Sequence, residues 1–205
     1  DAIAPTDATA ANLFDQNKGQ HTQLITAKNN GDLKINELTL QKLDGSDIGA
    51  GTIRSIDQNG QTVAKGTYNY ALNKTGGLGV NYGLSALEIV DGQTLTLSTA
   101  NATNKEMTAA ITGSGDLTLT SDAMGLTLTN DQNAYTGATN VTAGLVTAGS
   151  DNAFGHTSSL NLAAKTTVNL NGKTQTVGSL TNAGSVDLAG GSLVVTNAKG
   201  ASSTS

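Results

Sequence analysis

Apolar and polar residues alternate in very short runs through the last third of the chain. Apolar–polar–apolar triplets stand at residues 160–162 (LNL), 168–170 (VNL) and 186–188 (VDL), and a further apolar run at 193–195 (LVV). Gly and Asn recur between them, and the run centres lie about seven to ten residues apart, which is typical of short strands joined by tight turns. A repeat this short predicts a solenoid, in which each coil covers the apolar edge of the next.

The pattern begins upstream at 33–35 and 38–40 and becomes regular from 111 onward, with runs at 117–119 and 126–128. Between these parts, two alternating runs within 52–72 flank Asn59-Gly60, a dipeptide that favours a two-residue turn. This predicts a β-hairpin that projects from the solenoid. Residues 101–110 are the one passable helix candidate, or a loop between coils, and residues 1–20 are expected to be a loose entry segment or the tail of a preceding coil.

The predicted fold class is therefore all-β, a three-stranded β-solenoid. With roughly 20–25 residues per coil, the chain has room for about eight coils. Coils spaced by about 4.8 Å would form a rod on the order of 40 Å long. The ends of such a rod are unpaired strand edges, through which a fragment could associate end to end.

Composition supports a narrow core. Among 205 residues there are 25 Gly, 4 Tyr, 2 Phe and no Trp, so small aliphatic side chains must fill the interior. The net charge is −5, the basic residues are scattered, and Arg54 is the single Arg, which argues against nucleic-acid binding and against an anionic membrane surface as partner.

Export is compatible with the composition. The chain has no Cys, as suits a protein that must stay unfolded while crossing a second bacterial membrane, although many cytosolic proteins lack Cys too. The first residues lack the features of a signal peptide, and no run of roughly 20 apolar residues is present. If the protein is secreted, we expect this chain to be a fragment or a processed product.

Candidate chemistry is sparse. The Gly-rich stretch at 73–83 suggests a phosphate loop, but no helix pattern and no Lys-Ser/Thr follow, so a chain reversal between coils is favoured. Ser114, His156 and Asp151 could form a nucleophilic triad, yet the Ser lies in an ordinary turn sequence. With two His and no H-E-x-x-H motif, no transition-metal site is predicted.

Other polar groups leave alternatives open. A β-helix hydrolase would need paired carboxylates, for which Asp44 with Asp47 and Asp122 with Asp131 are the candidates, although Asp is common in turns. A lyase acting on uronates would need more cations than one Arg. Calcium at an Asp/Asn turn stays open, although the G-G-x-G-x-D repeat is missing. The three Tyr at 68, 70 and 82 could form a contact surface or cover one end of the core.

The amino-acid sequence of the C-terminal third resembles that of a known family. NAYTGATNV (133–141), AGL (143–145) and GSDNAFG (149–155) resemble the passenger-associated repeat of Gram-negative autotransporters, N-x-Y-T-G-x-T-x-V…G-x-L…A-L-G. LNGKTQTVGSL (170–180) is similar to the L-N-G-x-x-Q-x-V-G-x-L element that follows it. VNYGL (80–84) and DGQTLTL (91–97) look like a segment of AIDA/pertactin-like adhesins. The resemblance covers about 66–197; Phe154, where the family usually has Leu, and LVT at 145–147 depart from the pattern.

The resemblance implies a right-handed parallel β-helix passenger of a type V autotransporter, secreted through its own C-terminal outer-membrane β-barrel and displayed on the cell. Its last coils would be a folding seed, or autochaperone region. The expected parts are an entry segment or cap (1–32), coils with inserted loops or a hairpin (33–129), autochaperone-like coils (130–197) and the start of a linker toward the barrel (198–205).

The leading hypothesis is a non-enzymatic, membrane-proximal stalk and folding seed that supports cell adhesion or aggregation, with no cofactor and no catalytic, cofactor-binding or metal residues. The expected place is the cell surface, tethered to the outer membrane. The alternatives are a β-helix hydrolase or lyase acting on glycans, and a module that itself binds a host surface or matrix protein or self-associates.

Overall fold

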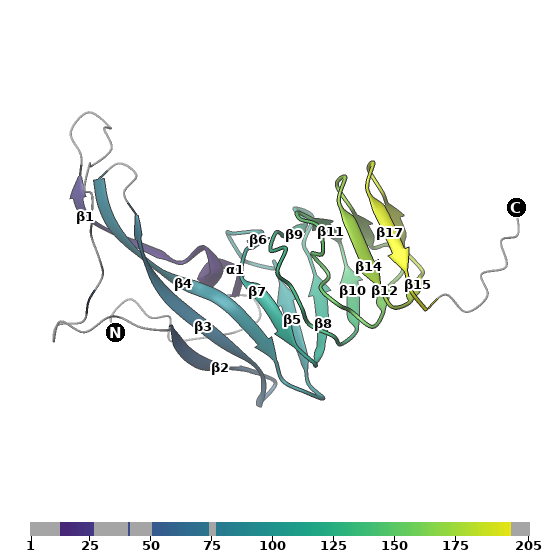
Figure 1. Cartoon of the computed structure of the whole chain (residues 1–205), viewed down its shortest axis with the longest axis horizontal. Coiled ribbons are helices and arrows are strands. Elements are labelled where there is room, and N and C mark those ends of the chain that lie inside the picture. Colours follow the sequence, from purple (N-terminus) through teal and green to yellow (C-terminus); the bar gives the residue numbers. More distant parts are fainter. Residues whose placement is uncertain (1–12, 27–40, 42–50, 74–76, 198–205) are drawn as a thin grey trace, which may run out of the picture.

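An antiparallel sheet and a column of stacked coils meet end to end in this protein (Figure 1). The computed structural model describes residues 13–26, 41, 51–73 and 77–197. The predicted strands at 33–40, together with Asp44 and Asp47, lie outside these residues. The described part of the chain contains no helix with the length and apolar character needed to span a membrane.

The antiparallel sheet is built by the longest strands. β1 (Gln20–Thr26), β4 (Gly77–Ile89), β3 (Gln61–Asn73) and β2 (Thr52–Gln58) lie in that order. Asn59 and Gly60 form the turn between β2 and β3 with φ of 53° and 76°, a backbone region that Asn and Gly tolerate best. The predicted hairpin is confirmed, and β1 and β4 extend it into a larger sheet.

The coils begin where β4 exchanges antiparallel for parallel pairing. The end of β4 pairs with β7 (Ala110–Gly113), so the sheet and the solenoid share one strand. The remaining strands are β5 (Thr94–Ser98), β6 (Glu106–Met107), β8 (Asp116–Thr120), β9 (Leu126–Leu128), β10 (Thr139–Ala143), β11 (Leu145–Ala148), β12 (Leu160–Leu162), β13 (Thr167–Asn169), β14 (Thr174–Val177), β15 (Leu180–Asn182), β16 (Ser185–Asp187) and β17 (Ser192–Val195).

These strands stack into three faces. One face has the order β15-β12-β10-β8-β5, the second β16-β13-β11-β9-β6, and the third contains β4, β7, β14 and β17. Two irregular segments complete the third face, since Ala134 N donates to Ile111 O at 2.8 Å and Gly178 N donates to Thr157 O at 2.9 Å. Every face is thus closed by backbone hydrogen bonds from coil to coil.

Five coils follow one another along the column, and the β-solenoid prediction is confirmed with about five turns in the described chain. We number them coil 1 (86–107), coil 2 (110–128), coil 3 (133–148), coil 4 (153–169) and coil 5 (174–187); β17 opens a further one. The estimate of about eight coils was too high, because the chain upstream of Ala86 that the structure describes forms helix and antiparallel sheet instead.

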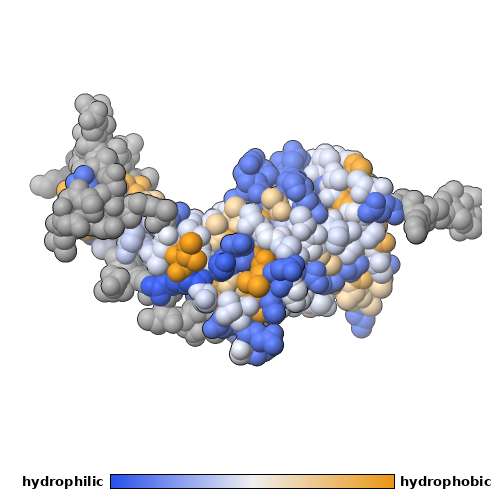
Figure 2. Space-filling view, turned by 60° about the horizontal axis from the view of Figure 1, so that its bottom comes forward, coloured by the Kyte–Doolittle hydropathy of each residue, from blue (hydrophilic) through white to orange (hydrophobic). Residues whose placement is uncertain are grey.

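The core follows the alternation of the sequence. Inward-facing aliphatic residues such as Leu95, Leu117 and Leu160 are fully buried, and the residues between them face outward. Leu95 pairs with Leu117 and Leu160 with Leu180, so a coil takes about 20–22 residues, within the expected range. On the face seen in Figure 2, the apolar side chains of the described residues form small, separate spots.

The segment after β14 keeps the apolar–polar pattern but not the burial. Leu180 is 37% exposed and Leu188 47% exposed, whereas Leu160 one coil earlier is fully buried. The whole of β15 is exposed, because no later coil in the described chain lies over it. Burial in this fold therefore depends on having a neighbour on both sides.

The only helix of the described residues lies where a loose segment was expected. α1 (Leu13–Lys18) buries Leu13 and Phe14 completely. The helix candidate at 101–110 forms a turn and β6 instead, and it is the place where α1 docks. The Asp15 carboxylate accepts hydrogen bonds from Thr103 N at 2.9 Å and Asn104 N at 2.7 Å.

Candidate functional site

The candidate nucleophilic triad does not assemble. Ser114 Oγ donates to Asp91 Oδ1 at 2.8 Å, across the corner between two successive coils. Asp151 Oδ1 accepts from Thr174 N at 2.7 Å, and the His156 side chain is exposed. The Ser and the Asp therefore stabilise turns, as the turn interpretation predicted.

The candidate carboxylates of Asp122 and Asp131 bond to different partners. Lys105 Nζ donates to Asp122 Oδ2 at 2.6 Å, and this hydrogen bond holds the pKa of the Asp122 carboxyl below its usual value. Asp131 Oδ1 accepts instead from the side chain of its neighbour Gln132 at 3.0 Å. Within the described residues, no group of three or more His, Cys, Asp or Glu is placed to hold a metal ion.

The Gly-rich stretch from Gly77 onward belongs to β4. A Cβ at Gly79 would lie 2.3 Å from Cε1 of the exposed His21 side chain, which would have to move aside. His21 Nδ1 lies 2.5 Å from Asn81 Oδ1, and its Nε2 lies 2.8 Å from Gln23 Oε1. The bonds to Gln23 and Asn81 raise the pKa of His21. The His21 ring thus lies over Gly79 where β1 pairs with β4.

The three Tyr form part of the core. The rings of Tyr68 and Tyr82 stack with centroids 6.0 Å apart, and Tyr70 lies tilted at 4.4 Å from Tyr82. Tyr68 and Tyr82 are 1% and 2% exposed, and the Tyr68 hydroxyl donates to Gln16 Oε1 of α1. Burial raises the pKa of Tyr68 to about 12. They cover the core end and do not form an open contact surface.

Buried polar side chains link the coils within residues 133–175. Asn133 is 1% exposed; its Oδ1 accepts from Ile111 N at 2.8 Å in coil 2, and its Nδ2 donates to Ala153 O at 2.8 Å in coil 4. Gln175 of coil 5 is fully buried and accepts from Phe154 N at 3.2 Å. Each amide replaces backbone pairing where the third face is irregular.

A chain of buried hydroxyls adds a second link. The hydroxyls of Tyr135 and Thr139 share a hydrogen bond of 2.7 Å, Thr139 Oγ1 donates to Thr157 Oγ1 at 2.9 Å, and Thr157 Oγ1 donates to Gly137 O at 2.8 Å. Burial raises the pKa of Tyr135, so its hydroxyl stays protonated and can donate. With the amides, these hydroxyls form what we call the coil lock: Asn133, Tyr135, Thr139, Thr157 and Gln175.

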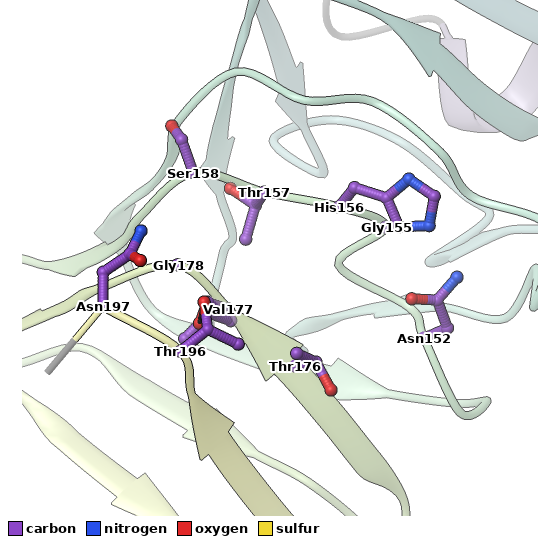
Figure 3. Close-up of a pocket in the computed structure, with 10 residues that line it drawn as sticks. All are labelled: Asn152, Gly155, His156, Thr157, Ser158, Thr176, Val177, Gly178, Thr196 and Asn197. Atoms are coloured by element: carbon purple, nitrogen blue, oxygen red, sulfur yellow. Dashed lines mark hydrogen bonds between the residues drawn. The ribbon is translucent and has the colours of Figure 1, made fainter.

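Beside the coil lock lies an open groove of about 320 Å³ (Figure 3). It crosses coils 4 and 5 and the start of the next coil. Ser158 and Asn197 lie at one end, His156 and Asn152 at the other, and Thr176 lies along β14. The lining residues are Asn152, Gly155, His156, Thr157, Ser158, Thr176, Val177, Gly178, Thr196 and Asn197.

Most of the residues that line the groove are polar, and none of them is Asp, Glu, Lys or Arg. Of the residues that line the groove, only His156 was a candidate from the sequence. Its residues come from three coils spaced about 20 residues apart, and each one by itself is an ordinary turn or strand residue. Only the register of the coils, which single-chain patterns do not specify, brings them together.

Comparisons with known proteins give long relatives of undetermined role. The uncharacterized lipoprotein YdeK of Escherichia coli (strain K12) is 42% identical over 149 residues, which cover 70% of this chain and 11% of YdeK. The uncharacterized protein YuaQ of the same strain is 35% identical over 201 residues, which cover 92% of this chain and 15% of YuaQ. The chain thus spans a small part of either relative. No family model and no solved structure matches it.

Proposed function

We propose that this chain is a solenoid segment of a surface-displayed autotransporter passenger, in which it acts as stalk and folding seed without catalysing a reaction. The observation that carries the proposal is the coil lock. Its buried amides and hydroxyls join coils 2, 3, 4 and 5 across each interface, at the residues that resemble the passenger repeat.

The coil lock gives a physical reason for seeding. Coils in a solenoid are stabilised mainly by their neighbours, so the first coil to form carries the cost of nucleation. A buried amide or hydroxyl costs about 1–3 kcal/mol when its partner is missing. Asn133 finds both partners only when coils 2 and 4 are in register. A correctly stacked group of coils is therefore favoured over a misregistered one.

A surface location agrees with this role. YdeK is named a lipoprotein, and lipoproteins are attached to membranes by their lipid. For this chain we propose the outer face of the outer membrane, with tethering through a C-terminal β-barrel in the longer precursor. Folding of the seed outside the cell would oppose backward movement of the chain and so assist export. Adhesion or aggregation would then be supported by the stalk's length and reach.

The test is deletion of residues 130–197 from a full-length precursor that contains this segment. We expect the barrel to insert while the remaining passenger becomes sensitive to external protease. A matched variant deletes the β2–β3 hairpin, 52–73, and should leave coils 2 to 5 resistant. A passenger that remains displayed and resistant without 130–197 would exclude the folding-seed role and leave that of a spacer.

A further inference from the structure

The groove beside the coil lock gathers several polar side chains that make no hydrogen bond within the described chain. Two polar side chains at neighbouring corners bond to their own turn instead: Asp187 accepts from Ala189 N at 3.0 Å and Asn182 accepts from Gly184 N at 3.0 Å. In the groove, no hydrogen bond within the described chain engages the side chains of His156, Ser158 and Thr176. The side chain of Asn197 is likewise without such a bond.

The backbone holds these groups open. Gly178 N donates to Thr157 O at 2.9 Å and Asn197 N donates to Gly178 O at 2.7 Å, so the strand order fixes the floor. Gly178 can carry no side chain there, because a Cβ would lie 2.1 Å from Ser158 O. Asn152 Nδ2 donates to Asn133 O at 3.0 Å, which leaves its Oδ1 as an acceptor at the groove wall. The wall is therefore anchored to the coil lock.

From these observations we infer that the groove is a binding site for a neutral saccharide. Hydroxyl, amide and imidazole groups both donate and accept hydrogen bonds, as the hydroxyls of a sugar do. The three coils span about 10 Å, and 320 Å³ is at the lower end of the range of ligand pockets. The lining contains no Asp, Glu, Lys or Arg that would attract a charged ligand. This goes beyond the stalk and seed role and does not depend on it.

The side chains of the groove also determine how tightly it would bind a sugar. The groove is open and contains no Tyr, Phe or Trp ring to stack on a sugar face, so we expect a dissociation constant on the order of 1 mM for one or two sugar units. Binding this weak becomes useful when many copies on a cell surface meet a polymer, because linked sites raise the overall avidity.

The test is NMR on the 205-residue chain with four probes: methyl β-D-glucoside, methyl β-D-galactoside, cellotriose and methyl β-D-glucuronide. Saturation transfer should reach at least one neutral sugar, and ¹⁵N shifts should move at Gly155, Ser158, Thr176 and Gly178. The uronide should bind no more tightly than its neutral counterpart. Absence of any signal at 10 mM sugar, or shifts confined to another face, would overturn the proposal.

Variants make the assignment specific. Thr176→Val keeps shape at an exposed position and removes one hydroxyl, so binding should weaken about three- to tenfold, as for one lost hydrogen bond. His156→Ala should do the same, and the double variant should lose detectable binding. Thr181→Val on the exposed β15 is the matched control and should bind like the parent chain. Equal binding by the double variant and the control would refute the site, and unchanged ¹⁵N spectra of the free variants establish that they are folded.

Discussion

The antiparallel sheet and the coils bury their apolar side chains by different means. In the sheet, β3 and β4 are neighbours in sequence and pair from Ala64 with Ile89 to Asn73 with Gly79, and aromatic rings fill the interior. In the coils, each strand pairs with one about 20 residues away, and the core is narrow and aliphatic. The hairpin can form early from local contacts, whereas each coil needs another coil.

The difference explains why polar groups are buried in the coils. Apart from Gln16, which bonds Tyr68, the buried polar residues of the described chain all lie in the coils or their turns. Aliphatic contacts alone would tolerate a shift of one coil against the next, since they are not directional. Directional bonds from Asn133, Thr139 and Gln175 specify the register. We therefore expect substitutions at coil interfaces to cost more than equivalent changes elsewhere.

The largest effect is expected from Gly137→Ala. A Cβ there would lie 2.1 Å from Gly115 O, which belongs to the backbone of the preceding coil and cannot turn away. The coils would have to separate, so we expect a loss of about 3 kcal/mol or more in unfolding free energy, measured by urea titration. Gly190→Ala is the matched control. Open space surrounds Gly190, whose φ is +82°, so its cost should be about 1 kcal/mol. Equal losses would show that coil spacing is not constrained at Gly137.

Asn133→Ala should have the next largest effect. It leaves Ile111 N and Ala153 O buried without their partner, and we expect a loss of about 2–4 kcal/mol in the same titration. Asn161→Ala removes an amide that bonds Asn140 Oδ1 at 2.9 Å on the partly exposed outer side, and it should cost about 0.5 kcal/mol or less. A loss below 1 kcal/mol for Asn133→Ala would mean that water or a shifted turn replaces the amide.

Tyr135→Phe probes the hydroxyl chain more gently. The ring still fills its place, and only the bond to Thr139 Oγ1 is lost, so we expect about 1–1.5 kcal/mol. Tyr70→Phe is the control in the antiparallel sheet, because Tyr70 is half-buried and its ring contact with Tyr82 survives the change. Thermal unfolding of the two variants should separate them by several degrees. If the unfolding temperatures of the two variants coincide, the hydroxyl chain contributes only packing to the stability.

These contrasts also show which features of the fold could be predicted from the sequence. The triplets at 160–162 and 126–128 predicted buried–exposed–buried strands, and Asn59-Gly60 predicted the hairpin, because both signals are local. The likeness of 133–141 to a passenger repeat singled out the segment that contains three of the five residues of the coil lock. Local patterns were sufficient wherever the structure repeats.

Local patterns failed where distant segments meet. Gly79 was predicted to lie in a chain reversal. Nothing in the neighbouring sequence indicates that His21, almost sixty residues earlier in the chain, packs against it. α1 was missed because its few residues form a helix only when Leu13 and Phe14 find the core and Asp15 finds the 103–104 turn. The groove was missed for the same reason. A short helix or a shared corner is a tertiary feature, and propensity says little about it.

The smallest effect we predict lies at this docking point of α1, and it depends on pH. Burial alone would raise the pKa of Asp15, but hydrogen bonds from Asn104 and Thr103 and the charge of Lys105 outweigh it and hold the pKa below its usual value. A depressed pKa in the folded state means that the ionised carboxylate stabilises the fold above about pH 4. That stabilisation should disappear as the pH falls through the folded-state pKa.

Asp15→Asn should therefore destabilise the chain at pH 6, and the difference from the parent chain should shrink as the pH falls through the folded-state pKa and the parent carboxyl becomes neutral. Thermal unfolding from pH 6 to pH 2 measures the difference. Asn17→Ala is the matched control, because Asn17 also docks α1, through Nδ2 to Leu84 O at 2.9 Å and Oδ1 from Thr108 N at 2.7 Å, but carries no charge. Its cost should not change with pH. If the two variants follow the same pH course, the carboxylate charge does not hold the helix, and α1 is held by its buried side chains and its uncharged hydrogen bonds.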